Sequence, residues 1–182
     1  MRARKEDSVA VLIDIQEKLV PVMEHKEELV ANCSNFVQGL RALDIPIVAT
    51  RQYPKGLGNL NLEILEALGE HEPFDKTSFS VYGDTKIKNQ IDGLGKKNIF
   101  LFGIETHICV LQSVIDFQAA GYQVYLVCDC CDSRHEKDHA IALERAMSEG
   151  ALLTTREAAM FELQGIASGD TFKKISALVK KL

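Results

Sequence analysis

Short apolar runs separated by amphipathic segments dominate the pattern of this chain. The clearest run, residues 9–15, is almost continuously apolar and rich in β-branched side chains, which is typical of a strand buried on both faces. Further runs of this kind predict strands at residues 45–49, 99–102, 124–127 and 151–153.

Segments with apolar residues at helical spacing lie between and after these runs. They predict helices around residues 29–40, 62–68, 110–120, 141–147 and 172–182. Gly121 and Gly150 each follow such a segment, where a left-handed helix cap is expected, and Pro54, Gly56 and Gly58 mark a loop. Strands that alternate with helices predict an α/β protein with a parallel sheet and helices on both faces.

The length and composition favour one globular domain over residues 1–182. The 182 residues suit a single core, and 46% hydrophobic and 26% charged residues are ordinary for a globular protein. A net charge of −5 argues against nucleic acid as a partner. No signal peptide and no apolar stretch long enough for a membrane span is evident, so we expect a cytoplasmic location without membrane contact. The odd number of cysteines, five, indicates free thiols in a reducing compartment.

Cys109 is the first candidate for chemistry. It follows the apolar run that stops at Gly103, and it stands just before an amphipathic segment. A helix N-terminus lowers the pKa of a thiol, and its free backbone N–H groups are suited to an oxyanion. The position therefore predicts a nucleophile, and the alternative is a buried cysteine packed as a small hydrophobe.

Two charged residues stand out beside the thiol. Asp14 interrupts the first apolar run, which favours either a general base tuned by partial burial or a turn cap that acts with Gln16. Lys76 lies in a mixed stretch flanked by aromatics, and its simplest interpretation is an exposed lysine paired with Asp75.

Three motifs together resemble the isochorismatase-like cysteine hydrolases. They are Leu-Ile-Asp-Ile-Gln around Asp14, Phe-Asp-Lys-Thr-Ser-Phe-Ser around Lys76, and Gly-Ile-Glu-Thr-His-Ile-Cys-Val ending beyond Cys109; the later Asp-Ser-Arg at residues 132–134 also fits. The resemblance runs from residue 9 to about residue 161. It implies a three-layer α-β-α sandwich around a six-stranded parallel sheet of order 3-2-1-4-5-6, in which the first and fourth strands are neighbours at the crevice that binds ligands.

The same resemblance implies an Asp–Lys–Cys triad. Cys109 is then the nucleophile, Asp14 the proton acceptor and donor, and Lys76 the group that favours the charged forms of both. The backbone N–H groups of Cys109 and Glu105 would form the oxyanion site, next to a cis peptide bond between Ile104 and Glu105. This chemistry predicts a small amide-type substrate cleaved at its C–N bond through a thioester. Isochorismate hydrolysis needs no cysteine, so Cys109 points away from it.

Nicotinamidases of this family bind a metal through an Asp-x-His pair after the second strand and a further His. Residues 49–58 contain no Asp or His here, and His71 stands alone, so we predict neither a catalytic metal nor another cofactor. Nicotinamidase activity becomes a minor alternative.

Residues 50–58 instead resemble a subgroup of short, domain-only members whose substrates are poorly assigned. The candidates to bind a small-molecule substrate are Gln16, Arg51, Gln52, Tyr53, Phe79 and His107. Relatives commonly assemble, so we also expect a homo-oligomer of unspecified size.

Other clusters suggest less. Cys128, Cys130 and Cys131 lack the paired spacing of a zinc site and are interpreted as reduced thiols at the end of the fifth strand. His135 and His139 lack a His-Glu-x-x-His frame and are interpreted as solvated. Two competing hypotheses remain, namely a catalytically silent scaffold of the same fold and a thiol redox protein that uses Cys109.

Overall fold

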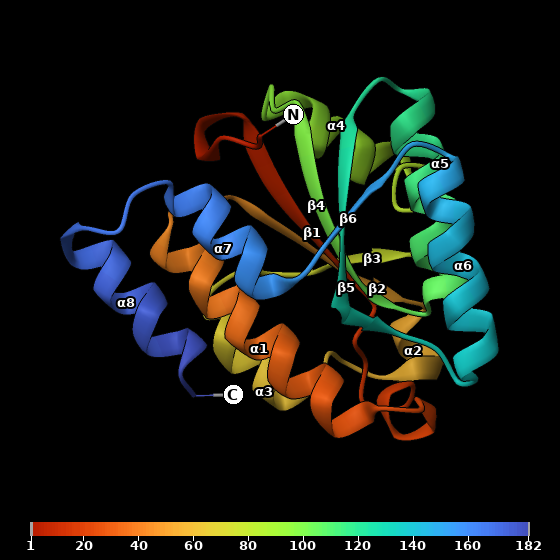
Figure 1. Cartoon of the computed structure of the whole chain (residues 1–182). Coiled ribbons are helices and arrows are strands. Elements are labelled where there is room, and N and C mark those ends of the chain that lie inside the picture. Colours follow the sequence, from red (N-terminus) through yellow and green to blue (C-terminus); the bar gives the residue numbers. More distant parts are fainter. Residues whose placement is uncertain (1, 182) are drawn as a thin grey trace.

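A six-stranded, wholly parallel sheet runs through the middle of the molecule (Figure 1). The computed structural model describes residues 2–181. The strand order is β3-β2-β1-β4-β5-β6, as the resemblance implies. The strands are β1 Ser8–Ile13, β2 Ile47–Gln52, β3 Phe74–Lys76, β4 Asn98–Ile104, β5 Gln123–Asp132 and β6 Leu152–Thr154.

Helices cover both faces of this sheet and complete a three-layer α-β-α sandwich (Figure 1). One face carries α1 Lys26–Ala42, α3 Leu62–Leu68, α7 Arg156–Gln164 and α8 Gly169–Val179. The other carries α4 Thr85–Gly93, α5 Leu111–Ala119 and α6 Glu136–Ser148. Because both faces are covered, every residue of β1 and β4 is buried, which explains why their sequences are nearly continuous apolar runs. Among the described residues, no helix is both long enough and apolar enough to cross a membrane.

The apolar runs locate five strands to within a few residues, and the glycine caps are also confirmed. Gly121 and Gly150 have φ angles of 88° and 100° at the ends of α5 and α6. The periodicity missed β3, α4 and α7, which have few buried residues each. The loop predicted around Pro54 contains a short helix, α2 Pro54–Leu57. The last helix is α8 rather than residues 172–182, and Leu182 lies outside the described residues.

The strand order brings together the two segments that follow β1 and β4, beyond the carboxyl ends of these neighbouring strands. From β1 the chain leads toward β2 and β3 on one side, whereas β4, β5 and β6 lie on the other. In such a sheet a crevice opens beyond the carboxyl ends of the two central strands, where the connections diverge. Asp14 directly follows β1, and the turn that contains Cys109 follows β4, so both residues lie beyond the carboxyl ends of these two neighbouring strands.

Gly103 allows β4 to approach β1 closely just before that turn. Its φ angle is 127°, and a Cβ built there would lie 2.1 Å from the backbone oxygen of Ile13. We expect Gly103→Ala to destabilise the fold by about 3 kcal/mol or more, because an L side chain meets both an unfavourable backbone conformation and a backbone clash. Urea denaturation measures this change.

Gly93 provides the matched control for that substitution. It lies at the end of α4, and a Cβ built there meets nothing within 4 Å. Gly93→Ala is expected to leave stability unchanged or to raise it by up to about 1 kcal/mol. Equal unfolding midpoints for the two alanine variants would contradict the role assigned to Gly103.

Candidate active site

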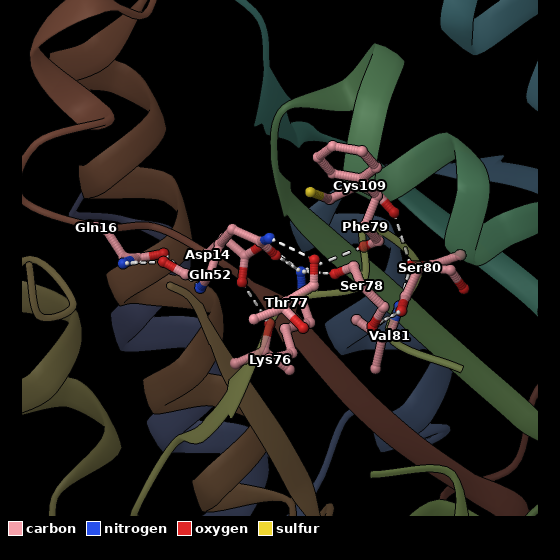
Figure 2. Close-up of polar contacts among 12 residues, drawn as sticks. Asp14, Gln16, Gln52, Lys76, Thr77, Ser78, Phe79, Ser80, Val81 and Cys109 are labelled. Carbon is pink, nitrogen blue, oxygen red and sulfur yellow. Dashed lines mark hydrogen bonds and ion pairs between the residues drawn. The ribbon is translucent and has the colours of Figure 1, made fainter. Parts of the chain in front are cut away.

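Three elements bring an acid, a base and a thiol together at the carboxyl edge of the sheet (Figure 2). Asp14 follows β1, and Lys76 is the last residue of β3. Cys109 lies in a π-helical turn, Thr106–Val110, that joins β4 to α5. Both Asp14 and Lys76 interact with the thiol of Cys109, so the structure brings the three predicted residues into one cluster.

Asp14 is fixed on all sides although it is charged. Its backbone adopts a positive φ of 52°, which aspartate tolerates better than most residues, and its N–H donates to the Thr50 carbonyl at 3.2 Å. The side chain is 1% exposed. One carboxylate oxygen accepts from the Thr50 hydroxyl at 2.8 Å, and the other from Lys76 Nζ at 2.6 Å. The buried charge is therefore both paired and hydrogen-bonded, as burial requires.

Lys76 is directed into this cluster by the alternation of side chains along β3. The register places Lys76 opposite Gln52 of β2, and Asp75 opposite Arg51. Successive strand residues point to opposite faces, so Lys76 and Asp75 do not pair. The predicted partnership of Lys76 with Asp75 is wrong, because Asp75 instead binds Arg51 Nε at 2.7 Å near the surface.

The Cys109 thiol is buried, and its pKa moves in the direction opposite to the one predicted from its position. Burial raises the pKa of Cys109 to about 12, and the negative charge of Asp14 adds to the rise. The positive charge of Lys76 acts against this rise without cancelling it. The prediction of a lowered thiol pKa is therefore wrong, and the resting site holds a protonated thiol beside a carboxylate.

This protonation state predicts slow alkylation of Cys109 at neutral pH. With a pKa of about 12, only about one thiol in ten thousand is ionised at pH 8, and the fraction rises about tenfold per pH unit. We expect the iodoacetamide rate at Cys109 to increase steadily from pH 7 to pH 10, as followed by intact mass. A Cys109→Ser variant corrects for reaction at the partly exposed Cys128. A rate plateau reached below pH 9 would contradict the prediction.

One hydroxyl connects the nucleophile turn to the segment that surrounds Lys76. Ser113 of α5 is fully buried, and its Oγ donates to the Cys109 carbonyl at 2.6 Å. The same Oγ accepts from the Val81 N–H at 2.9 Å. The carbonyls of Ser78 and Phe79, just before Val81, accept from Lys76 Nζ at 3.2 Å each. The positions of the thiol and the ammonium are thus coupled through the interior.

The start of the nucleophile turn is attached to the segment that follows β5. Glu105 accepts from Arg134 Nε at 3.0 Å and from the Arg134 backbone N–H at 3.1 Å. The Thr106 hydroxyl donates to the Asp132 carbonyl at 2.9 Å. The peptide bond between Ile104 and Glu105 is cis, as the resemblance implies. The segment at residues 132–134 therefore has a visible role, which is to hold the turn that carries Cys109.

The six predicted substrate-binding residues differ in exposure and in their contacts within the protein. The side chains of Gln16, Arg51 and Gln52 are engaged in hydrogen bonds or ion pairs within the protein. Tyr53 and Phe79 are 55% and 53% exposed. His107 is partly buried and contacts the Ser133 hydroxyl through Nδ1 at 2.9 Å. The backbones of both exposed aromatic residues contact Lys76, since the Tyr53 N–H donates to the Lys76 carbonyl at 2.9 Å and the Phe79 carbonyl accepts from Lys76 Nζ.

Comparison with known proteins agrees with this architecture. The isochorismatase domain matches residues 8–158, which is most of the chain. The chain belongs to the isochorismatase family. Isochorismatase domain-containing protein 2A of Mus musculus is 36% identical over 99% of this chain and 86% of its own length.

Further members of the isochorismatase family differ in length and in name. Isochorismatase domain-containing protein 1 of Salmo salar is 33% identical over 92% of this chain, which spans only 59% of that relative. A solved structure called MAR1 ribonuclease, from Caenorhabditis elegans, superposes with a TM-score of 0.93 at 33% identity, over 99% of this chain and 93% of its own. These similarities establish the hydrolase family and the fold.

The interpretations of the other cysteines and histidines of this isochorismatase-family chain have mixed outcomes. All five cysteines are free, and Cys130 and Cys131 are buried within β5. His139 is half-buried and contacts the Thr106 hydroxyl through Nδ1 at 2.9 Å, so the solvated interpretation of this histidine is wrong. Within residues 2–181, no group of three or more Cys, His, Asp or Glu side chains is arranged to hold a metal ion.

Sequence reasoning missed several residues that shape the site. Thr50 and Ser113 carry no motif, and both are fully buried polar residues. Thr50 ends the apolar run of β2, and Ser113 lies one helical turn after Cys109. A hydroxyl at helical spacing from a nucleophile is too common to predict a contact, so only the fold reveals these partners.

Proposed function

We propose that this protein is a metal-independent cysteine hydrolase that cleaves the C–N bond of a small amide-type substrate. The observation that supports the proposal is the cluster in which a buried Asp14–Lys76 pair interacts with a protonated Cys109 thiol. A carboxylate beside a thiol is the arrangement that general-base activation of a nucleophile requires. Five free thiols suit a reducing, cytoplasmic compartment, and a homo-oligomer remains part of the proposal.

The proposed reaction has two stages. Asp14 accepts the thiol proton as Cys109 Sγ attacks the carbonyl carbon, and the backbone N–H groups of Glu105 and Cys109 receive the oxyanion. The C–N bond then breaks, the leaving amine takes the proton from Asp14, and a thioester remains. Asp14 next accepts a proton from water, whose oxygen attacks the thioester. The C–S bond breaks, the acid leaves, and the thiol regains a proton. Lys76 stabilises the carboxylate and thiolate forms throughout.

The test is a screen of small amides and ureas, read by ammonia release. We expect at least one compound to be hydrolysed and a slow substrate to leave an acyl adduct that intact mass detects at Cys109. Absence of both turnover and adduct across the screen would favour the silent scaffold. Rapid reaction with hydrogen peroxide that yields an internal disulfide would favour the redox hypothesis.

A ribonuclease is the second candidate, favoured by the name of the solved relative from Caenorhabditis elegans. A net charge of −5 does not favour binding of a polyanion. A fluorescently labelled single-stranded RNA, incubated with the native protein and with Cys109→Ala, separates the two functions. If the native protein cleaves the RNA and Cys109→Ala does not, ribonuclease activity would replace the amide proposal.

A further inference from the structure

The ammonium of Lys76 has two short hydrogen bonds, and only one of them goes to a charged group. Nζ donates to Asp14 Oδ2 at 2.6 Å and to Gln52 Oε1 at 2.7 Å. The Ser78 and Phe79 carbonyls accept at 3.2 Å each. An ammonium has three N–H donors, so the two longer contacts share the third. The Lys76 side chain is 0% exposed, which leaves no solvent to replace the contact with Gln52.

Gln52 is itself held in the orientation that presents its oxygen to Lys76 (Figure 2). Its Nε2 donates to the Thr77 carbonyl at 2.9 Å, which directs Oε1 toward the ammonium. The backbone of Gln52 is bonded at both ends to Gln16, since its N–H donates to Gln16 Oε1 at 2.7 Å and its carbonyl accepts from Gln16 Nε2 at 3.0 Å. Gln16 is fully buried and lies two residues after Asp14. Asp14 and Gln52, the two residues that accept the short hydrogen bonds from Lys76, are therefore connected to each other through Gln16.

The neutrality of the Gln52 amide matters for the thiol. Asp14 raises the pKa of Cys109 and Lys76 lowers it, so the thiol experiences the balance of the two charges. A second carboxylate at the position of Gln52 would add negative charge to the cluster and further disfavour the thiolate. An amide oxygen accepts the same hydrogen bond without that charge.

We propose that Gln52 is a positioning residue that holds the Lys76 ammonium against Asp14 and, being neutral, leaves its positive charge available to the Cys109 thiolate. This inference rests on the proposed function, in which that thiolate is the nucleophile. Gln52 acts through Lys76 rather than by contact with the substrate, which assigns to it a role different from the substrate binding predicted from the sequence.

The test is the alkylation rate of Cys109 in Gln52→Glu, measured with iodoacetamide at pH 9 by intact mass. We expect the rate to fall about tenfold or more, because each unit of added thiol pKa lowers the thiolate fraction tenfold. Gln38→Glu on α1 introduces the same charge change at an exposed glutamine, and its rate is expected to stay within twofold of the native rate. A rate within twofold of native in folded Gln52→Glu would overturn the proposal.

A second variant decides the matter if Gln52→Glu does not fold. Gln52→Met removes the acceptor at similar length, so the Lys76 ammonium loses one of its two short contacts and is no longer held in place beside Asp14 and the thiol. We therefore expect alkylation to slow at least threefold. An unchanged rate in this variant overturns the proposal. Where a hydrolysed amide is known, kcat falls while KM stays within twofold; a change in KM alone indicates substrate contact instead. Alkylation needs no turnover, so failure of the amide screen does not alter this result and is recognised separately.

Discussion

Replacing Cys109 with alanine is expected to abolish amide hydrolysis, lowering kcat/KM at least about a thousandfold. Without the thiol no thioester forms, and the remaining groups have no nucleophile to activate. Cys109 is 7% exposed, and removal of one sulfur atom leaves only a small cavity, so the variant is expected to fold. Kinetics on a compound from the amide screen, together with intact mass for the acyl adduct, measure both effects.

Cys128→Ala is the matched control for the loss of the nucleophile. Cys128 is partly exposed whereas the other four cysteines are buried, and its Sγ donates to the Thr154 carbonyl. This variant should retain native kcat/KM and native acyl adduct. Retention of more than a tenth of the activity in Cys109→Ala would show that water, activated directly by Asp14, attacks the substrate.

The strands were predictable because a parallel sheet covered on both faces requires continuous apolar runs. The β1 and β4 sequences satisfy that requirement, and both strands were located from it. β3 was not, since Phe74–Lys76 is a three-residue edge strand that contains two charged residues. The helix α4 was not predicted for a related reason, because Ile87 and Ile91 are its only buried residues. A short element leaves too few buried positions for its period to be recognised.

The site was predictable in its members but not in its electrostatics. Asp14, Lys76 and Cys109 were recognisable from motifs, whereas their partners depend on the register of β2 with β3. That register places Gln52 beside Lys76 and Arg51 beside Asp75. Proximity in the sequence alone instead suggests a pair between Lys76 and Asp75. The thiol pKa was mispredicted because a position near a helix start does not reveal burial, and burial is the larger effect here.

Removing Lys76 alone is expected to destabilise the protein by about 3–5 kcal/mol. Lys76→Met leaves the Asp14 carboxylate buried with two neutral side-chain partners, the Thr50 hydroxyl and the Cys109 thiol, and a buried charge without an opposite charge is costly. Asp14→Asn together with Lys76→Met removes both charges, so the double variant should lose clearly less stability than the two single variants added together. Urea denaturation of the four proteins gives the coupling free energy directly.

The exposed ion pair between Asp170 and Lys173 is the control for the buried pair, because it has a similar contact without the burial. Lys173 Nζ and Asp170 Oδ1 are 3.1 Å apart, yet the side chains of Asp170 and Lys173 are 90% and 78% exposed. Water and salt screen such a pair, so Lys173→Met is expected to leave the unfolding midpoint unchanged. If the Asp14–Lys76 cycle were equally additive, the buried pair would contribute no coupling. The thiolate would then lack the fixed positive charge on which both the proposed hydrolysis and the role of Gln52 depend.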